Sequence, residues 1–417
     1  MSAVRVAAPA PPAGRRVPRR AWLALLALAL VLRLAVVAVS PPRIFMPDGI
    51  AYEAIGRALH EGRGYGLQTQ RPPGYPTLVA GVYALLGPDL TRLRVVEAVL
   101  GTATVGVVGA AGAALFGGPA GLVAAALAAI HPVMALLPAT QYSENLLLLL
   151  VALAFAAAFA AWRRGGGWRW ALTGLLYGLV LLVRPNVVTM VPGLVAGLAL
   201  ALRRQGRPWL APVLLTGLAA ALTVAPWVVR CHRVHDRWFL ISTGGGASFW
   251  LANNPAMTGA SDQLVSYPPE LMRELTALPG PASRESLFYE RGKDFVRANP
   301  GRAARLYLAR LGNLFALYPE TATRSSFMNA GARVGQGVVS ALLFLGALLA
   351  LRRWRSTPAL WPMVGAIATF ALVSAAYFTV FRYRLPFEPL LLWMAGRGWA
   401  GVLARPAPAG QATGEPR

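Results

Sequence analysis

Residues 21–40 read AWLALLALALVLRLAVVAVS, an apolar run that only Arg33 interrupts. About 20 apolar residues in helical conformation span the hydrocarbon core of a bilayer, so this run predicts a membrane helix. A cleaved signal peptide is the alternative, but the run continues into Ser-Pro-Pro rather than a small-residue cleavage site. The basic, Pro- and Ala-rich stretch 1–20 predicts a disordered cytoplasmic tail, because arginines tend to remain on the cytoplasmic side of a membrane helix.

The composition indicates that the whole chain is of this kind. Residues of the AVILMFWYC set make up 56% of the 417 residues and charged residues 13%, which leaves too little polar surface to cover a water-exposed globule. The net charge of +24 comes almost entirely from arginines that punctuate apolar runs, and Lys293 is the one lysine. A nucleic-acid interface would instead need a basic face on a soluble domain. The single cysteine, Cys231, excludes an intrachain disulfide and a cysteine-cluster metal site.

Further apolar stretches bring the expected number of membrane spans to about ten. They lie at 93–116, 119–138, 143–161, 168–183, 186–202, 209–229, 333–351, 358–380 and 386–404. Arginine clusters near 163–169, 203–207 and 352–355 fall in short connections on the same side as the basic N-terminus, as the positive-inside rule requires. The opposite, extracytoplasmic side then receives the two long segments 41–92 and 230–332.

These stretches predict an all-α polytopic membrane protein with a small extracytoplasmic domain of α/β type. The expected parts are a transmembrane region at 21–229 with a first outer loop at 41–92, the extracytoplasmic domain at 230–332, C-terminal transmembrane helices at 333–404, and a disordered cytoplasmic tail at 405–417. The extracytoplasmic domain is expected to contain a strand at Trp238–Ser242, a Gly-rich turn at 244–246, and helices at Ser283–Asn299 and Arg302–Leu317.

Two charged residues of the first outer loop are candidates for chemistry. Asp48 follows the first span, where a carboxylate serves either as the N-cap of the next helix or as a general base facing a membrane-borne substrate. Arg71 begins Arg71-Pro72-Pro73-Gly74-Tyr75-Pro76, whose prolines stiffen the backbone. A rigid guanidinium is the preferred partner of a phosphate oxygen, and a snorkelling interfacial anchor is the alternative.

Several motifs occur in a fixed order along the chain. Asp48 is followed by a short helix, by Gly62-Arg63-Gly64-Tyr65-Gly66 and by the Arg71–Pro76 motif. Further on come Tyr142-Ser143-Glu144-Asn145, Asn253-Asn254-Pro255 and Arg382-Tyr383-Arg384-Leu385-Pro386. This order resembles the GT-C superfamily of membrane glycosyltransferases, in particular glycosyltransferase family 39, the protein O-mannosyltransferase and aminoarabinose transferase-like group. The resemblance covers roughly residues 20–400.

The resemblance implies a GT-C fold and an activity. Such enzymes transfer a sugar, with inversion, from a polyprenyl-phosphate-linked donor to an acceptor at the outer face of the membrane. Asp48 corresponds to the catalytic carboxylate, which would deprotonate an acceptor hydroxyl or orient an anionic acceptor. Arginine suits the charge of a lipid phosphate leaving group, and four arginines fall at the expected outer face: Arg71, Arg184, Arg382 and Arg384.

Other residues complete the expected site. Glu144 is the second acid, either pairing with one of these arginines or binding the acceptor. Tyr52, Tyr75 and Asn253 are expected to contact substrate. We expect no cofactor, no catalytic metal and no nucleic acid, and the acceptor class is open between protein, lipid and glycan. The expected location is the bacterial plasma membrane.

Two other classes of protein compete with this interpretation. A polytopic transporter or lipid flippase would share the hydropathy pattern, but it often shows related halves and polar groups near the bilayer midplane. Here Arg33 is almost the only midplane charge, and no pseudo-repeat is visible. A catalytically silent scaffold protein would keep the fold but would not depend on Asp48.

Overall fold

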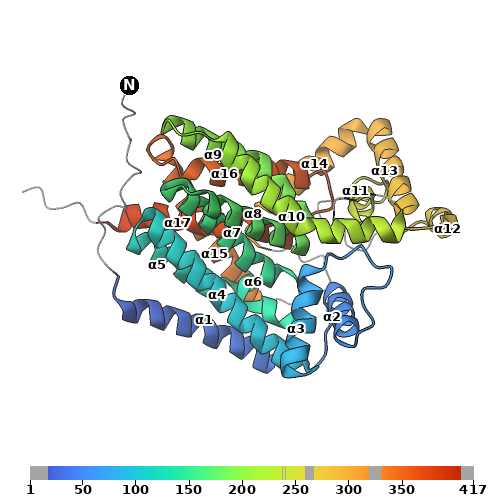
Figure 1. The fold of residues 1–417 in the computed structure, drawn as a ribbon, viewed down its shortest axis with the longest axis horizontal. Coiled ribbons are helices and arrows are strands. Elements are labelled where there is room, and N and C mark those ends of the chain that lie inside the picture. The colour runs from blue at the N-terminus through green and yellow to red at the C-terminus, as the bar shows by residue number, and fades with distance from the viewer. Residues whose placement is uncertain (1–16, 237, 240, 259–266, 319–329, 405–417) are drawn as a thin grey trace, which may run out of the picture.

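The computed structural model describes residues 17–236, 238–239, 241–258, 267–318 and 330–404. Helices from most of these ranges pack side by side into one bundle (Figure 1). Most of the tail predicted at 1–20 and all of the tail predicted at 405–417 lie outside the described residues. The protein is a multi-pass membrane protein, because six described helices are long and apolar enough to cross a bilayer.

The six long spans are α1 (Arg19–Val39), α4 (Leu90–Phe116), α7 (Glu144–Arg164), the continuous pair η2 (Pro185–Met190) and α9 (Val191–Arg204), α10 (Leu210–His235) and α15 (Ala330–Leu351). The bent pair formed by α5 (Gly118–Ile130) with α6 (Pro132–Leu136) and η1 (Leu137–Ala139) is long and apolar enough only when its two parts are taken together. Shorter apolar helices are α3 (Gly74–Leu86), α8 (Gly167–Val183), α16 (Leu360–Ser374) and α17 (Glu388–Leu403), with η3 (Trp354–Ser356) before α16. Every apolar stretch expected from the sequence coincides with one of these helices, and the total of about ten spans stays a prediction.

The bend between α5 and α6, of 56°, has a cause in the sequence. Pro132 has no N–H to continue the helix, so carbonyl groups at the end of α5 lose their partners. Arg33 of α1, fully buried, donates to the carbonyls of Ala128 and Ala129 at 3.4 and 3.5 Å. The one charge inside the first span therefore satisfies backbone groups of a broken helix, as buried polar groups in a membrane must be satisfied.

Elsewhere the bundle packs through small residues. Gly193 of α9 meets Gly365 of α16 so closely that a Cβ on Gly193 would lie 1.8 Å from the Gly365 carbonyl oxygen. Membrane helices depend on such approaches because lipid provides no hydrophobic drive for association.

One end of the bundle carries the helices that do not belong to the membrane spans (Figure 1). These are α2 (Pro47–His60) beside α3, and α11 (Gly245–Ala252), α12 (Pro269–Ala277), α13 (Pro281–Ala298) and α14 (Pro300–Leu314). They come from the expected segments 41–92 and 230–332. The last short element, η4 (Phe381–Phe387), lies directly before α17.

The strand expected at Trp238–Ser242, and with it the α/β character of the 230–332 segment, is wrong for the described residues. They form helices and no strand. The reason is that the described part of the chain offers no strand for pairing. The carbonyl of Ile241 accepts from the indole of Trp227 at 2.7 Å, and Thr243 donates to the carbonyl of Thr69 at 3.3 Å. The chain here is a connector held by single hydrogen bonds rather than by a ladder.

Candidate functional site

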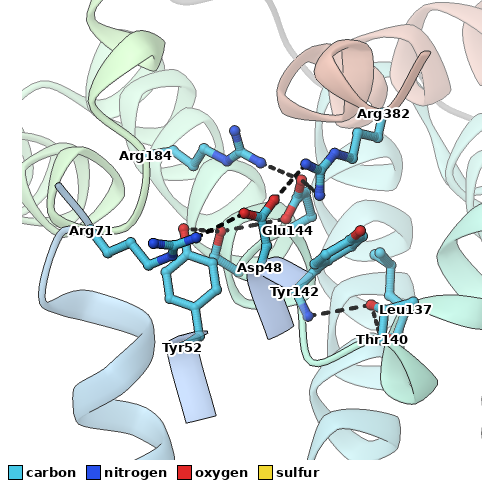
Figure 2. Close-up of polar contacts among 10 residues, drawn as sticks. Asp48, Tyr52, Arg71, Leu137, Thr140, Tyr142, Glu144, Arg184 and Arg382 are labelled. Carbon is cyan, nitrogen blue, oxygen red and sulfur yellow. Dashed lines mark hydrogen bonds and ion pairs between the residues drawn. The ribbon is translucent and has the colours of Figure 1, made fainter. Parts of the chain in front are cut away.

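Asp48 lies in the first turn of α2 and does not cap it. The N-cap is Met46, and no side chain caps the helix, so the N-cap alternative for Asp48 is wrong. The carboxylate instead accepts from Arg71 Nη2 at 3.0 Å and from Arg382 Nη2 at 2.6 Å (Figure 2). Gly49 makes this placement possible, because a Cβ there would lie 2.4 Å from the carbonyl oxygen of Thr140. The start of α2 can therefore rest against the turn that precedes α7.

Arg71 and Arg184 reach the same place through the contact of α3 with α8. Gly74 begins α3, and a Cβ on it would lie 2.6 Å from Val183 at the end of α8. Arg184 follows Val183 directly, so this close contact brings it near Arg71. The backbone N–H of Arg71 donates to Gln68 Oε1 at 3.1 Å, which holds the loop in front of α3.

Glu144 begins α7 and is almost fully buried. Its carboxylate pairs with Arg184 and lies 3.7 Å from Arg382 Nη1. The preceding turn is tight. Gln141 has a positive φ of 53°, and Tyr142 N donates to Thr140 Oγ1 at 3.3 Å. This turn places the ring of Tyr142 4.2 Å from the guanidinium of Arg382.

Asp48, Arg71, Glu144, Arg184 and Arg382 thus form one group, here called the cavity cluster, in which the three guanidiniums converge on the two carboxylates (Figure 2). One positive charge is in excess. Burial raises the pKa of the Asp48 carboxyl, but the guanidiniums of the cluster, Arg382 first, lower it by more, so its pKa lies below the ordinary value. Asp48 is therefore held as a carboxylate at neutral pH.

The cluster opens onto a cavity of about 480 Å³. Asp48, Tyr52, Arg71 and Arg184 line it, and Tyr383, next to Arg382 in sequence, contributes its ring. Tyr52 packs beneath the guanidinium of Arg71 at 5.4 Å. Other parts of the wall come from α11, α13 and the connector before α11, including Gly245, Ser248, Glu285 and Tyr289. The volume is in the range of ligand pockets.

Three residues expected from the sequence lie elsewhere. Tyr75 is fully buried behind Tyr52, with the two rings edge to face at 5.3 Å. Asn253 donates to the carbonyls of Phe249 and Ala376 at 2.9 and 3.0 Å, so its amide ties α11 to the bundle. Arg384 points into the protein and pairs with Glu388 at 2.5 Å. None of the three lines the cavity, and each has a packing or structural contact in the protein.

Several residues of the site are not among those expected from the sequence. Tyr383 lines the cavity and Tyr142 packs on the guanidinium of Arg382, and both occur inside motifs quoted above, close in sequence to Arg382 and Glu144. Glu285 and Tyr289 lie one turn apart on α13, a helix with many charged residues, so nothing in their spacing distinguishes them from solvent-facing positions. In the described ranges, no three His, Cys, Asp or Glu side chains are grouped as metal ligands.

Fold and site together define a multi-pass membrane protein with a positively charged cavity at one end of a helical bundle. Residues 70–229 match the sequence profile of the dolichyl-phosphate-mannose-protein mannosyltransferase family. No curated protein matches the sequence. The comparison with solved structures shows that the chain has a GT-C fold, as the motif order predicted.

The similar structures include the oligosaccharyltransferase of Archaeoglobus fulgidus in the apo form, with 15% identity and a TM-score of 0.52 over 92% of this chain and 51% of that one. The archaeal oligosaccharyltransferase AglB from Archaeoglobus fulgidus, in complex with an inhibitory peptide and a dolichol-phosphate, gives 15% identity and a TM-score of 0.52 over 92% of this chain and 50% of that one. ArnT from Cupriavidus metallidurans bound to undecaprenyl phosphate gives 16% identity and a TM-score of 0.47 over 92% and 79%. The chain spans about half the length of the archaeal enzyme.

Proposed function

We propose that the protein transfers a sugar from a polyprenyl-phosphate-linked donor to an acceptor, with inversion, at the outer face of the membrane. The observation that carries the proposal is the cavity cluster, in which three guanidiniums surround the Asp48 carboxylate beside a cavity of a GT-C fold. Two further facts support it. The matching family profile is that of a lipid-phosphate-dependent mannosyltransferase, and one similar structure contains a dolichol-phosphate.

The excess positive charge suits a phosphate that carries a lipid on one oxygen and a sugar on another. Guanidinium forks bind phosphate oxygens through paired hydrogen bonds, and a preorganised cation stabilises charge that develops on the leaving oxygen. In this proposal Arg71 and Arg382 bind the donor phosphate. Arg184 stays paired with Glu144, which fixes its guanidinium beside them.

Asp48 is bound on both oxygens without substrate, which makes it a weak base in that state. A donor phosphate competes for Arg71 and Arg382, and this loosens their hold on Asp48. Its pKa then rises, because burial remains while part of the cationic field is taken up by the phosphate. The carboxylate becomes a proton acceptor when the donor is bound.

In the chemical step the acceptor oxygen attacks the anomeric carbon from the face opposite the phosphate. Asp48 takes the acceptor proton as the new glycosidic bond forms. The bond from the anomeric carbon to the phosphate oxygen breaks, and its electron pair stays on the lipid phosphate beside the arginines. Attack from the opposite face inverts the anomeric configuration.

The expected outer-face location rests on charge. α7 starts at Glu144 in the cavity cluster and ends at Arg163 and Arg164, and α9 likewise ends at Arg203 and Arg204. These arginine clusters therefore lie at the other end of the bundle from the cavity. The positive-inside rule supports a cytoplasmic side for these arginines and an extracytoplasmic side for the cavity, and the proposed membrane is a bacterial plasma membrane. Residues of α11 and α13, from the described part of 230–332, form part of the cavity wall, a position suited to selecting the acceptor.

The test is turnover in nanodiscs with a panel of radiolabelled undecaprenyl-phosphate sugars and candidate protein, lipid and glycan acceptors. The proposal expects release of undecaprenyl phosphate with one donor, and a product whose anomeric configuration is inverted. Movement of intact donor lipid between leaflets, with no cleavage of any donor, would contradict the proposal and favour the flippase alternative.

A further inference from the structure

One part of the cavity wall has no role in the phosphate chemistry described above. It consists of Glu285 and Tyr289 of α13, Tyr377 after α16, and the glycine turn that starts α11. Gln70 joins this part to the cavity cluster, because it precedes Arg71 and packs against Gly244, where a Cβ would lie 3.5 Å from its Cγ. A ligand bound at Arg71 therefore has this wall beside it.

The glycine turn is shaped to fit α13. A Cβ on Gly245 would lie 2.5 Å from the hydroxyl of Tyr289, and one on Gly246 would lie 2.4 Å from the carbonyl oxygen of Glu285. Gly246 N donates to Glu285 Oε1 at 2.7 Å. These contacts fix the Glu285 carboxylate and the Tyr289 ring at the cavity surface, so the wall is preorganised.

The chemistry of this wall differs from that of the cavity cluster. The rings of Tyr289 and Tyr377 each lie 5.7 Å from the ring of Phe249, which groups three aromatic side chains beside one carboxylate. Among the described residues that line the cavity, the only arginines are Arg71 and Arg184, and both belong to the cavity cluster. This part of the wall therefore offers a ligand the carboxylate of Glu285, which accepts hydrogen bonds, and no arginine that would bind an anion.

We propose that Glu285, Tyr289 and Tyr377 form a subsite for a neutral, hydroxyl-rich sugar ring. A carboxylate accepts from sugar hydroxyls in charge-assisted hydrogen bonds, and aromatic rings pack against the apolar C–H face of the ring. The same carboxylate repels a uronate or a phosphorylated sugar. This inference rests on the proposed function and specifies its substrate class; the ring belongs either to the donor or to a glycan acceptor.

The test uses Glu285→Gln, which keeps an oxygen for Gly246 N and removes only the charge. Glu290→Gln is the matched control, since Glu290 is an exposed acid on the same helix. Tyr377→Leu is a second variant on a different element. For each protein in nanodiscs, affinities are measured for undecaprenyl phosphate and for undecaprenyl phosphomannose, together with KM for a mannoside acceptor.

If the donor sugar occupies the subsite, Glu285→Gln weakens binding of the phosphomannose lipid about tenfold and leaves the bare lipid phosphate unchanged, as loss of a charged hydrogen bond predicts. If an acceptor sugar occupies it, both lipid affinities stay unchanged and the acceptor KM rises about tenfold for the same reason. Tyr377→Leu should change the same quantity as Glu285→Gln, either the affinity for the phosphomannose lipid or the acceptor KM. The subsite is overturned if wild type transfers sugar while Glu285→Gln and Tyr377→Leu both show the same lipid affinities and the same acceptor KM as Glu290→Gln. That result leaves the proposed function standing. Failure of wild type to bind either lipid would overturn both.

Discussion

Arg382 and Arg384 are two residues apart on η4, yet each belongs to a different cluster of carboxylates and guanidiniums. Arg382 joins the cavity cluster, where its side chain is 23% exposed and that of Asp48 36%. Arg384 joins what we call the core cluster, made of His131, Gln336, Ser340, Arg384 and Glu388. Arg384 Nε lies 2.5 Å from Glu388 Oε1, and the side chains of Arg384 and Glu388 are both 0% exposed.

The two clusters differ in what their charges can do. Arg384 Nη2 donates to Ser340 Oγ at 2.7 Å, and its Nη1 donates to the carbonyl of Ala316 at 2.5 Å. The hydrogen-bond donors of Arg384 are thus bound to other groups of the protein, and these bonds fix η4 against α15 and the end of α14. Asp48, Arg71 and Arg184 of the cavity cluster line the cavity, and the cluster carries an excess positive charge. In the proposed function its ion pairs are exchanged for substrate, so similar residue types would serve as an anchor in one place and as a binding group in the other.

The largest effect is expected for Asp48→Asn, which removes the proton acceptor without changing the shape of the site. Turnover of the donor should fall about a thousandfold, within the range that general bases contribute. The measurement is the rate of undecaprenyl phosphate release in nanodiscs. Asp294→Asn, at an exposed acid of α13, is the control. Rates within twofold of wild type would show that Asp48 takes no part in the chemistry.

Arg384→Met should chiefly affect stability. It leaves the buried Glu388 carboxylate without its main partner, and removal of one member of a buried ion pair costs about 3–5 kcal/mol. The free energy of unfolding, measured in mixed micelles, checks this. Arg382→Met should lower it by less than Arg384→Met does, because Asp48 and Glu144 keep Arg71 and Arg184 as partners. Equal losses for the two variants would remove the distinction between the clusters.

A smaller effect is expected when the positive charge at position 71 is kept but the shape of the charged group changes. Arg71→Lys replaces a planar fork with a point charge, so donor affinity should fall about tenfold with little change in the rate of the bound complex. Arg63→Lys, at an exposed arginine of the same loop that pairs with Glu61, is the matched control. A change in rate at unaltered donor affinity would argue that Arg71 does not bind the donor phosphate.

The smallest effect concerns pH. The Asp48 pKa is pulled below its ordinary value chiefly by Arg382 against the opposing effect of burial. Because the carboxylate must be ionised to accept a proton, kcat/KM is full above this pKa and is lost as pH falls through it. Arg382→Gln removes the main lowering influence, so the acid limb of its kcat/KM profile should lie at higher pH than in wild type. An acid limb at the same or a lower pH would contradict the assignment.

The sequence was sufficient for the features that depend on composition and local motifs. Apolar length located the helices, the motif order marked Asp48, Arg71, Glu144 and Arg382, and the expected topology added Arg184; the structure brings these five into one cluster. Whether they act as proposed stays a prediction. Gly49, directly after Asp48, and Gly74, within the Arg71–Pro76 motif, each allow a close contact between distant segments.

Features that depend on side-chain direction and on tertiary contacts could not be predicted from the sequence. In a 3₁₀ turn, with three residues per turn, positions two apart point to different sides, so Arg384 reaches Glu388 in the protein interior whereas Arg382 reaches Asp48 and Glu144. The motif alone does not show this. Glu285 reaches the cavity only because the glycine turn packs on α13, a contact between segments about 40 residues apart in sequence. The strand expected at Trp238–Ser242 failed for the same reason, since a strand needs a neighbour that local sequence does not specify.

The most direct test of the account compares donor cleavage by Arg382→Met and Arg384→Met in nanodiscs, each normalised to the amount of folded protein. The account predicts that folded Arg384→Met keeps a rate near that of wild type, while Arg382→Met loses about a hundredfold or more, as removal of a preorganised group that stabilises developing charge does. A near-wild-type rate for Arg382→Met would contradict the central claim that the cavity cluster is where the lipid phosphate is bound and released.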